Sequence, residues 1–329
     1  MKQNLLQNFF LFLFMGTSMY ALQACSDDDD ENGGGSSNTN VGEVVPGSGK
    51  KLLSAGDFNF YYGPNGKLKY VREGDDRHEF FSNQVVSYYD YYYGEDIEED
   101  DKEVINISYN GKGYISKMHV SETWEDDYEK GFYTSTMNLS YDGEGHLTKV
   151  TGKYSEEEVE DGETWKEEGT ETINLTWNNG LLVKYEAIGS DNDGWTYKET
   201  ATFDYEDREY TNRHHQYAPF IEDLLGEVAT IFAYVGLFGE GPDYLPASVT
   251  YEEVELYEGE EEYSWDYDES YTYDFNGDGT IYRVNSDYFT YGKIDEQGEI
   301  DEYQSKATRA EKPQKRGFIF SSRLKERDR

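Results

Sequence analysis

A short hairpin unit recurs in this sequence and limits its fold more than any other feature. Each copy has a strand ending in an aromatic residue, a turn rich in Gly and Asn or Asp, and a second strand that begins with aliphatic and basic residues. Gly, Asn and Asp tolerate the positive φ that tight hairpins require. The five copies span 60–71, 109–118, 141–150, 177–185 and 273–284. They predict a chain of antiparallel hairpins.

The apolar residues of these units show two different spacings. Before the turns they alternate with polar residues, which indicates half-buried strands. After the turns they lie three apart, which breaks strict alternation and predicts a β-bulge or a twist in each returning strand. The alternating sets are Ile105, Ile107 and Tyr109, then Met137, Leu139 and Tyr141, then Ile173, Leu175 and Trp177; the spaced pairs are Leu68 and Val71, Ile115 and Met118, Leu147 and Val150, and Ile281 and Val284.

Composition supports an all-β fold. The 32 Tyr and 17 Phe provide ring area for a core although only 36% of the residues are apolar. We therefore expect one all-β domain over 52–303, a large antiparallel up-and-down sheet or barrel-like meander of repeated hairpins. The strongly acidic segments between hairpins, such as 155–168 and 257–262, are interpreted either as long loops or as solvent-exposed strand extensions that make one rim very negative.

One segment departs from the β pattern. Apolar residues recur every three or four positions over about 219–236, which predicts an amphipathic helix. Pro219 suits its first turn and Gly236 its end. Glu222, Asp223 and Glu227 argue against a membrane span, and we expect the helix to cover one face or one open end of the sheet.

The amino terminus has the pattern of an export signal. One lysine, an apolar run and small residues precede Cys25, so residues 1–24 are predicted to be a lipoprotein signal peptide. Leu22, Gln23, Ala24 and Cys25 resemble the lipobox of bacterial lipoproteins. Cleavage between Ala24 and Cys25 and attachment of the lipid to the Cys25 thiol are the expected results. An ordinary signal peptide that happens to contain Cys is the alternative.

The segments that flank the domain carry opposite charges. Residues 27–31 are all acidic and resemble the export signal that moves lipoproteins to the cell surface in Bacteroides-type bacteria. Residues 25–51 are expected to form a flexible acidic and Gly/Ser-rich tether. Residues 304–329 are predicted to be a basic, disordered tail able to fold back on the acidic rim.

Charge and cysteine content limit the partners. A formal net charge of −40 repels the phosphates of nucleic acid, whereas divalent cations, glycans or proteins remain suitable partners beside the membrane that holds the lipid. Cys25 is the single cysteine, so we expect no disulfide framework, zinc knuckle or thiol catalysis. Every Gly cluster lies between predicted strands, which argues against a phosphate-binding loop. No cofactor is predicted.

Candidate site residues are few. Asp274, Asn276 and Asp278 resemble a calcium loop, but the closing acidic residue is missing because the twelfth position is Asn285. A hairpin turn is the favoured interpretation. No histidine spacing or carboxylate pair predicts a catalytic centre. Aromatic residues in polar segments suit sugar stacking, although an ordinary Tyr-rich sheet would show them too: Tyr88, Tyr89, Tyr91, Tyr92, Tyr93, Trp124, Trp165 and Trp195.

The second half of the domain resembles a known family. The resemblance lies in 203–205, the predicted helix, 236–239, 244–249 and the hairpin at 271–284. The chain is similar to an uncharacterised family of Bacteroides-type lipoproteins, a domain of unknown function with a porin-like fold, over roughly 52–303. The resemblance implies a barrel-like antiparallel sheet with an inserted helix, and it supplies no catalytic or ligand residues. Strands this charged do not suit the apolar outer band of a pore.

These features predict a lipid-anchored protein of the outer membrane, exposed at the cell surface. Its expected function is that of a non-catalytic binding or surface-architecture module. Two alternatives remain open: a glycan-active enzyme that uses buried carboxylates, with one acid of raised pKa beside aromatic rings, and a calcium-dependent adhesin whose acidic loops gather the ion.

Overall fold

The computed structural model describes residues 41–63, 66–74, 76–88, 102–125, 129–160, 163–221 and 227–294. The predicted signal peptide, Cys25, the acidic residues after it and the 304–329 tail therefore lie outside the described residues. The strands are β1 Lys50–Ala55, β2 Phe58–Tyr62, β3 Leu68–Glu73, β4 Asp76–Phe80, β5 Gln84–Tyr88, β6 Lys102–Tyr109, β7 Ile115–Glu125, β8 Glu129–Tyr141, β9 Leu147–Glu160, β10 Glu163–Asn178, β11 Leu181–Asp191, β12 Trp195–Asp204, β13 Tyr210–Thr211, β14 Tyr244–Leu245, β15 Ser248–Tyr257, β16 Glu260–Ser270, β17 Tyr273–Phe275, β18 Ile281–Val284 and β19 Asp287–Lys293.

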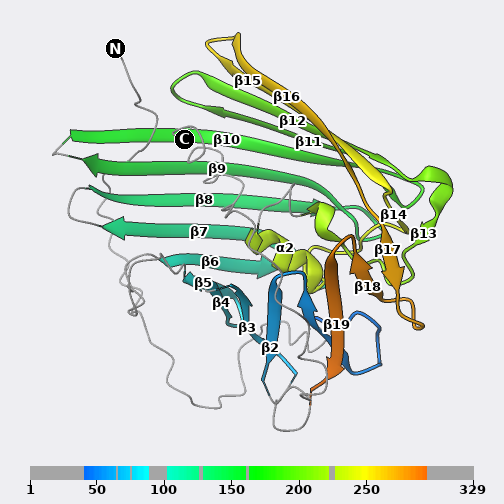
Figure 1. The fold of residues 1–329 in the computed structure, drawn as a ribbon. Helices are drawn as coiled ribbons and strands as arrows, with labels where there is room; N and C mark the ends of the chain where they lie inside the picture. Colours follow the sequence, from blue (N-terminus) through cyan, green and yellow to red (C-terminus); the bar gives the residue numbers. More distant parts are fainter. Residues whose placement is uncertain are drawn as a thin grey trace.

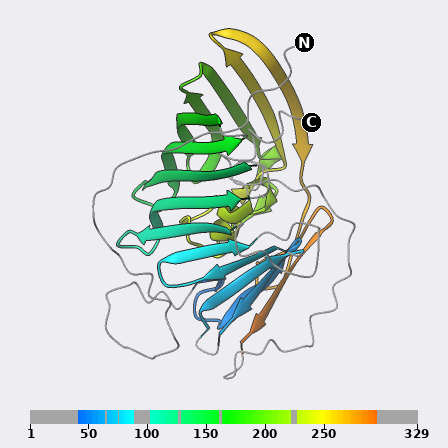
Figure 2. The ribbon, with the colours of Figure 1, turned by 90° about the vertical axis from the view of Figure 1, so that its left-hand side faces the viewer.

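The strands form a 17-stranded antiparallel sheet and one two-stranded ribbon, β13 with β14. From β1 to β12 each strand pairs with the next one in the chain, and β12 pairs with β15 and β15 with β16. At the other end β1 also pairs with β19, which pairs with β18. The long strands β6 to β10 lie side by side, and the sheet curves around the helix (Figures 1 and 2). The predicted all-β hairpin meander is confirmed.

The predicted bulges are present in all five hairpin units. In each unit the register shifts beside the aromatic residue that ends the first strand, and one residue of the returning strand has no partner in the register. These residues are Lys69, Ser116, Thr148, Val183 and Tyr282. Because the bulge shifts the alternation, residues three apart, such as Ile115 and Met118, both lie in the core.

Aromatic side chains hold neighbouring hairpins together at their turn ends. The Tyr141 hydroxyl donates to the Ile115 carbonyl at 2.6 Å, and the Trp177 indole N–H donates to the Leu147 carbonyl at 2.8 Å. The Tyr205 hydroxyl donates to the Leu182 carbonyl at 2.8 Å. Each acceptor lies just beyond the last backbone pair between its two strands. We call these three contacts the aromatic latches, since they extend the pairing past the bulges.

The predicted helix is present, and its described part ends at Tyr234, before Gly236. A 3-10 turn covers Pro219–Ile221, the α-helix α2 covers Glu227–Tyr234, and 222–226 lie outside the described residues. Gly236 follows with φ 78°, as expected for a residue that ends a helix. Phe232 contacts the Phe80 ring with a centroid distance of 6.0 Å, so α2 covers one end of the sheet face that it contacts. None of the helices in the described ranges is long and apolar enough to cross a membrane.

The folded unit includes residues that we expected to belong to the tether. The Gly42 N–H donates to the Val235 carbonyl just after α2, and the Gly42 carbonyl accepts from the Leu52 N–H. Val41 and Val44 pack against the core. The domain therefore already includes residues 41–49, upstream of the expected boundary at Leu52.

Candidate binding face

The face of the sheet that carries α2 is here called the inner face. Its side chains change from apolar to acidic and aromatic along the long strands. Close to the helix it is apolar: Val150 of β9 lies opposite Ile173 of β10, and both are buried. Further along the same strands the inner positions hold carboxylates and aromatic rings. The strand register shows which residues share this part of the face: Glu103, Glu122, Tyr133, Tyr154, Glu156, Glu158, Glu167, Glu171, Tyr197, Glu199, Glu253, Glu255, Trp265 and Tyr267. We call this set the acidic–aromatic face.

The acidic–aromatic face is built by strands that continue into the acidic segments. Strand β9 runs to Glu160 and β10 starts at Glu163, so most of 155–168 is paired strand. Of the two sequence interpretations, the strand extension is correct and the long loop is wrong. A pleated strand sends alternate side chains to opposite faces, so half of these acidic residues point inward.

Two tyrosines of this face lie across glycines of the adjacent strand. A Cβ atom on Gly169 would come within 2.3 Å of the Tyr154 ring, and one on Gly189 within 2.1 Å of the Tyr197 ring. The Tyr154 hydroxyl donates to Glu167 at 2.6 Å, and the Tyr197 hydroxyl donates to Glu171. The glycines therefore make room for rings that orient neighbouring carboxylates.

The aromatic rings of β15 and β16 form a stacked group at one side of this face. Tyr267 stacks between Tyr251 and Trp265, with centroid distances of 4.5 and 4.9 Å. The Trp265 indole N–H donates to Glu253 at 2.7 Å. Rings and carboxylates thus alternate across neighbouring strands, an arrangement that suits ligands with positive charge or with stacking surfaces.

Charge is segregated between the two faces of the sheet. Among the described side chains of β6 to β12, β15 and β16, no Lys or Arg occupies an inner position. Every lysine described there lies on the outer face: Lys117, Lys130, Lys149, Lys153, Lys166, Lys184 and Lys198.

Two buried hydroxyls point into the acidic–aromatic face. Tyr133 and Ser135 are 3% and 1% exposed, and apart from the contact between the two hydroxyls neither has a hydrogen-bond partner among the described residues. Burial raises the pKa of Tyr133, and the nearby carboxylates of Glu156, Glu103 and Glu122 add to that rise. Buried polar groups normally have a partner, so these hydroxyls are suited to contact a ligand.

Burial raises the pKa of several described carboxyl groups, among them Glu157, Asp191 and Asp287. Burial raises the pKa of Glu157 to about 7, but this residue lies on the outer face, 3.6 Å from the Lys166 ammonium. Burial also raises the pKa of Asp191, whose carboxylate accepts the N–H groups of Asp193 and Trp195 and so caps a hairpin turn.

The calcium-loop candidates form the hairpin turn that we favoured. Asp274 pairs with Arg283 at 2.6 Å, and Asp278 pairs with Lys50 at 3.1 Å. Hydrogen bonds from Thr280 and the contact with Lys50 lower the pKa of Asp278 to about 2. Asn276 closes the turn through backbone bonds with Thr280 and Gly279. A calcium ion here would have to displace the bonds to Lys50 and Thr280.

Of the aromatic residues suggested for sugar stacking, some lie near the acidic–aromatic face and others lie outside the described residues. Trp165 and Trp195 lie half-buried at inner positions of β10 and β12, near the acidic–aromatic face. Residues 89–93 and the side chain of Trp124 lie outside the described part of the chain, and Tyr88 is half-buried in β5. The carboxylates of the face were missed as individual residues, because the run of Glu156, Glu157 and Glu158 does not show which side chains point inward.

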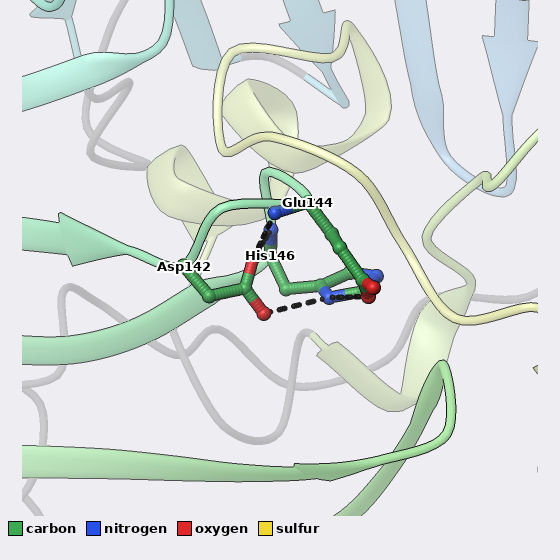
Figure 3. Close-up of side chains that lie close together, drawn as sticks. All are labelled: Asp142, Glu144 and His146. Atoms are coloured by element: carbon green, nitrogen blue, oxygen red, sulfur yellow. Dashed lines mark hydrogen bonds and ion pairs between the residues drawn. The ribbon is translucent and has the colours of Figure 1, made fainter.

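One further group comes together that the sequence analysis did not select. Asp142, Glu144 and His146 place possible metal-ligand atoms within 4.8 Å of one another in the turn between β8 and β9 (Figure 3). One Asp142 oxygen accepts the N–H groups of Glu144, Gly145 and His146, and the other lies 2.9 Å from His146 Nδ1. His146 also stacks on Trp177 at 4.1 Å. These contacts account for the group as a capped turn.

Fold and site together define an antiparallel β-meander protein with a segregated acidic–aromatic face. No protein-family model and no curated protein matches the chain. Among solved structures it is similar to a porin-like protein from Bacteroides vulgatus ATCC 8482, with 11% identity, 71% of this chain and 90% of that chain covered, and a TM-score of 0.41. A porin-like protein from Bacteroides uniformis ATCC 8492 is similar with 16% identity, 74% and 93% coverage and a TM-score of 0.39.

Proposed function

We propose that this protein is a surface-exposed outer-membrane lipoprotein, anchored through Cys25, that binds a positively charged ligand on its acidic–aromatic face without catalysing a reaction. The observation that carries the binding proposal is the segregation of charge, with carboxylates at inner positions and lysines at outer ones. Random placement of acidic residues for solubility would not empty one face of lysine. Carboxylates attract cations, and the rings add cation–π contacts.

The anchoring part of the proposal rests on the lipobox-like residues 22–25 and the acidic run that follows. Its test is fractionation of cells that express the wild type or Cys25→Ala. We expect the wild type in the outer-membrane fraction and open to added protease on intact cells. Membrane retention of the Cys25→Ala protein equal to the wild type would refute the lipid anchor.

Glycan binding is the second candidate function, favoured by the stacked Tyr251, Tyr267 and Trp265 and by the exposed ring of Tyr263. The distinction is electrostatic, because binding of a neutral sugar by stacking is insensitive to salt, whereas binding of a cation weakens as salt screens the carboxylates. Calcium binding to the same carboxylates would raise the melting midpoint at micromolar to millimolar ion.

The binding proposal is tested with the lipid-free chain of residues 26–329 and a fluorescent decalysine peptide. Glu199→Gln/Glu253→Gln removes two adjacent inner charges of β12 and β15, and Glu252→Gln/Asp266→Asn removes two adjacent outer charges of β15 and β16. We expect the inner pair to weaken binding about tenfold or more and the outer pair to change it less than about threefold. Equal effects of the two pairs, or binding only to neutral glycans on an array, would refute the proposal.

A further inference from the structure

The chain carries a polycation of its own. Its last 24 residues, 306–329, contain nine basic side chains and only three acidic ones, Glu311, Glu326 and Asp328, in a protein whose formal net charge is −40. The basic residues are Lys306, Arg309, Lys312, Lys315, Arg316, Arg323, Lys325, Arg327 and Arg329. Phe318, Ile319 and Phe320 lie among them. This composition of cations and apolar groups is the chemical complement of a surface made of carboxylates and aromatic rings.

We infer that the basic segment 306–329 binds the acidic–aromatic face of the same chain and competes there with external ligands. The inference rests on the proposed function, because it uses the same face. Its first support is charge complementarity. The described inner positions of β6 to β12, β15 and β16 hold carboxylates and no Lys or Arg, and 306–329 is the basic end of this acidic chain.

The second support is the pair of buried hydroxyls. Tyr133 Oη and Ser135 Oγ, both more than nine-tenths buried, point into the face beside Glu122 and Glu156 and, apart from the contact between the two hydroxyls, have no hydrogen-bond partner among the described residues. Guanidinium and ammonium groups donate several hydrogen bonds and accept none. An Arg or Lys side chain therefore suits both hydroxyl oxygens and the carboxylates around them.

The length of the connection allows this contact. Strand β19 ends at Lys293, and the 12 residues from 295 to 306 span up to about 40 Å when extended. That length is close to the roughly 46 Å of the 14-residue strand β9, at about 3.3 Å per residue. A segment tethered in this way reaches an effective concentration in the millimolar range, so even a weak contact would occupy the face and act as an intramolecular competitor.

Competition of this kind has a functional consequence. A ligand of higher charge or tighter fit would have to displace the segment, so the segment sets the affinity threshold of the face. Weakly cationic solutes would be excluded. Removal of the segment would open the face to all cationic ligands, which is what the experiment measures.

The experiment compares the lipid-free chain 26–329 with a version that ends at Tyr303, both checked for equal melting midpoints and circular dichroism. Two fluorescent probes are used, decalysine and a synthetic peptide of residues 304–329. A control peptide has Gln in place of every Lys and Arg. We expect the truncated protein to bind decalysine at least about tenfold tighter than the full chain does. It should also bind the 304–329 peptide but not the Gln peptide.

The inner pair Glu199→Gln/Glu253→Gln should weaken peptide binding to the truncated protein, whereas the outer pair Glu252→Gln/Asp266→Asn should not. Two outcomes separate this inference from the proposed function. If the truncated protein binds decalysine at the inner face but does not bind the 304–329 peptide, the inference that 306–329 is an intramolecular ligand is wrong and the proposed function stands. If it binds neither probe, both are wrong. Equal decalysine affinities of the two chain lengths also overturn the competition.

Discussion

His78 shows at the residue scale how burial of one titratable group affects stability. Its side chain is fully buried at an inner position of β4, with Nδ1 3.0 Å from the Ser87 hydroxyl. Burial lowers its pKa to about 4, although Glu73 and Asp76 act in the opposite direction. The group is therefore neutral in the folded protein over a pH range in which an unfolded histidine is charged.

This shift predicts a loss of stability in mild acid. Between pH 6.5 and pH 4 the unfolded chain takes up a proton at His78 that the folded chain does not, so stability falls as the pH decreases through this window. At pH 5.0 the loss relative to pH 7.5 should be about 2 kcal/mol. Urea unfolding at both pH values measures it. His78→Gln should remove that part of the pH dependence, whereas exposed His119→Gln should retain it.

Glu157 predicts a pH dependence of opposite sign. Burial raises its pKa to about 7 in spite of Lys166, so the folded protein holds a proton there that the unfolded chain has released. The associated stability is present below about pH 4.5 and is lost as the pH rises through 7. Glu157→Gln should therefore stabilise the protein at pH 8.5, by at most about 3 kcal/mol, and have almost no effect at pH 5. A stabilisation of equal size at both pH values would contradict the assigned cause.

At the scale of elements, the aromatic latches link hairpins that are otherwise joined by strand pairing. Tyr141→Phe keeps the ring but removes the donor to the Ile115 carbonyl. We expect a loss of about 1 kcal/mol in the free energy of unfolding, with an unchanged denaturant slope. Tyr282→Phe, at an exposed bulge position, is the control and should change the free energy by less than about 0.5 kcal/mol. Equal effects would mean that the latch bond is not stabilising.

The turn between β8 and β9 gives a second prediction for an element. Asp142 accepts three backbone N–H groups through one oxygen, and in the preceding hairpin Asn110 accepts those of Lys112 and Tyr114 in the same way. Asp142→Asn should keep the cap and cost less than about 1 kcal/mol, whereas Asp142→Ala should cost about 1–2 kcal/mol. Thermal melts compare the two variants. An Asn variant as unstable as the Ala variant would show that the His146 contact, not the cap, holds the turn.

At the scale of the whole molecule, the charge of −40 and its segregation place many carboxylates on one curved sheet. Such a surface repels itself, and added salt screens that repulsion. The melting midpoint should therefore rise between 0.01 and about 0.3 M NaCl. The inner pair Glu199→Gln/Glu253→Gln should raise the midpoint at low salt and make it less dependent on salt. A midpoint that falls with salt would show that attractive ion pairs outweigh the repulsion.

The sequence alone determined the hairpins, their turns and their bulges. Turn residues such as Gly66, Asn110 and Asp142 act through φ and local hydrogen bonds, and apolar spacing reports directly which side chains face the core. It determined the presence of α2 for the same reason, and Phe80 and Phe58 pack against this helix.

Only the tertiary structure decided that Glu167, Glu199 and Glu253 share one face with Tyr154 and Trp265. These residues come from five different strands and meet because of strand order and register, which depend on contacts far apart in the chain. Single-strand patterns of acidic residues look the same in a loop and in a strand extension. Register across the sheet is what turns scattered carboxylates into one surface.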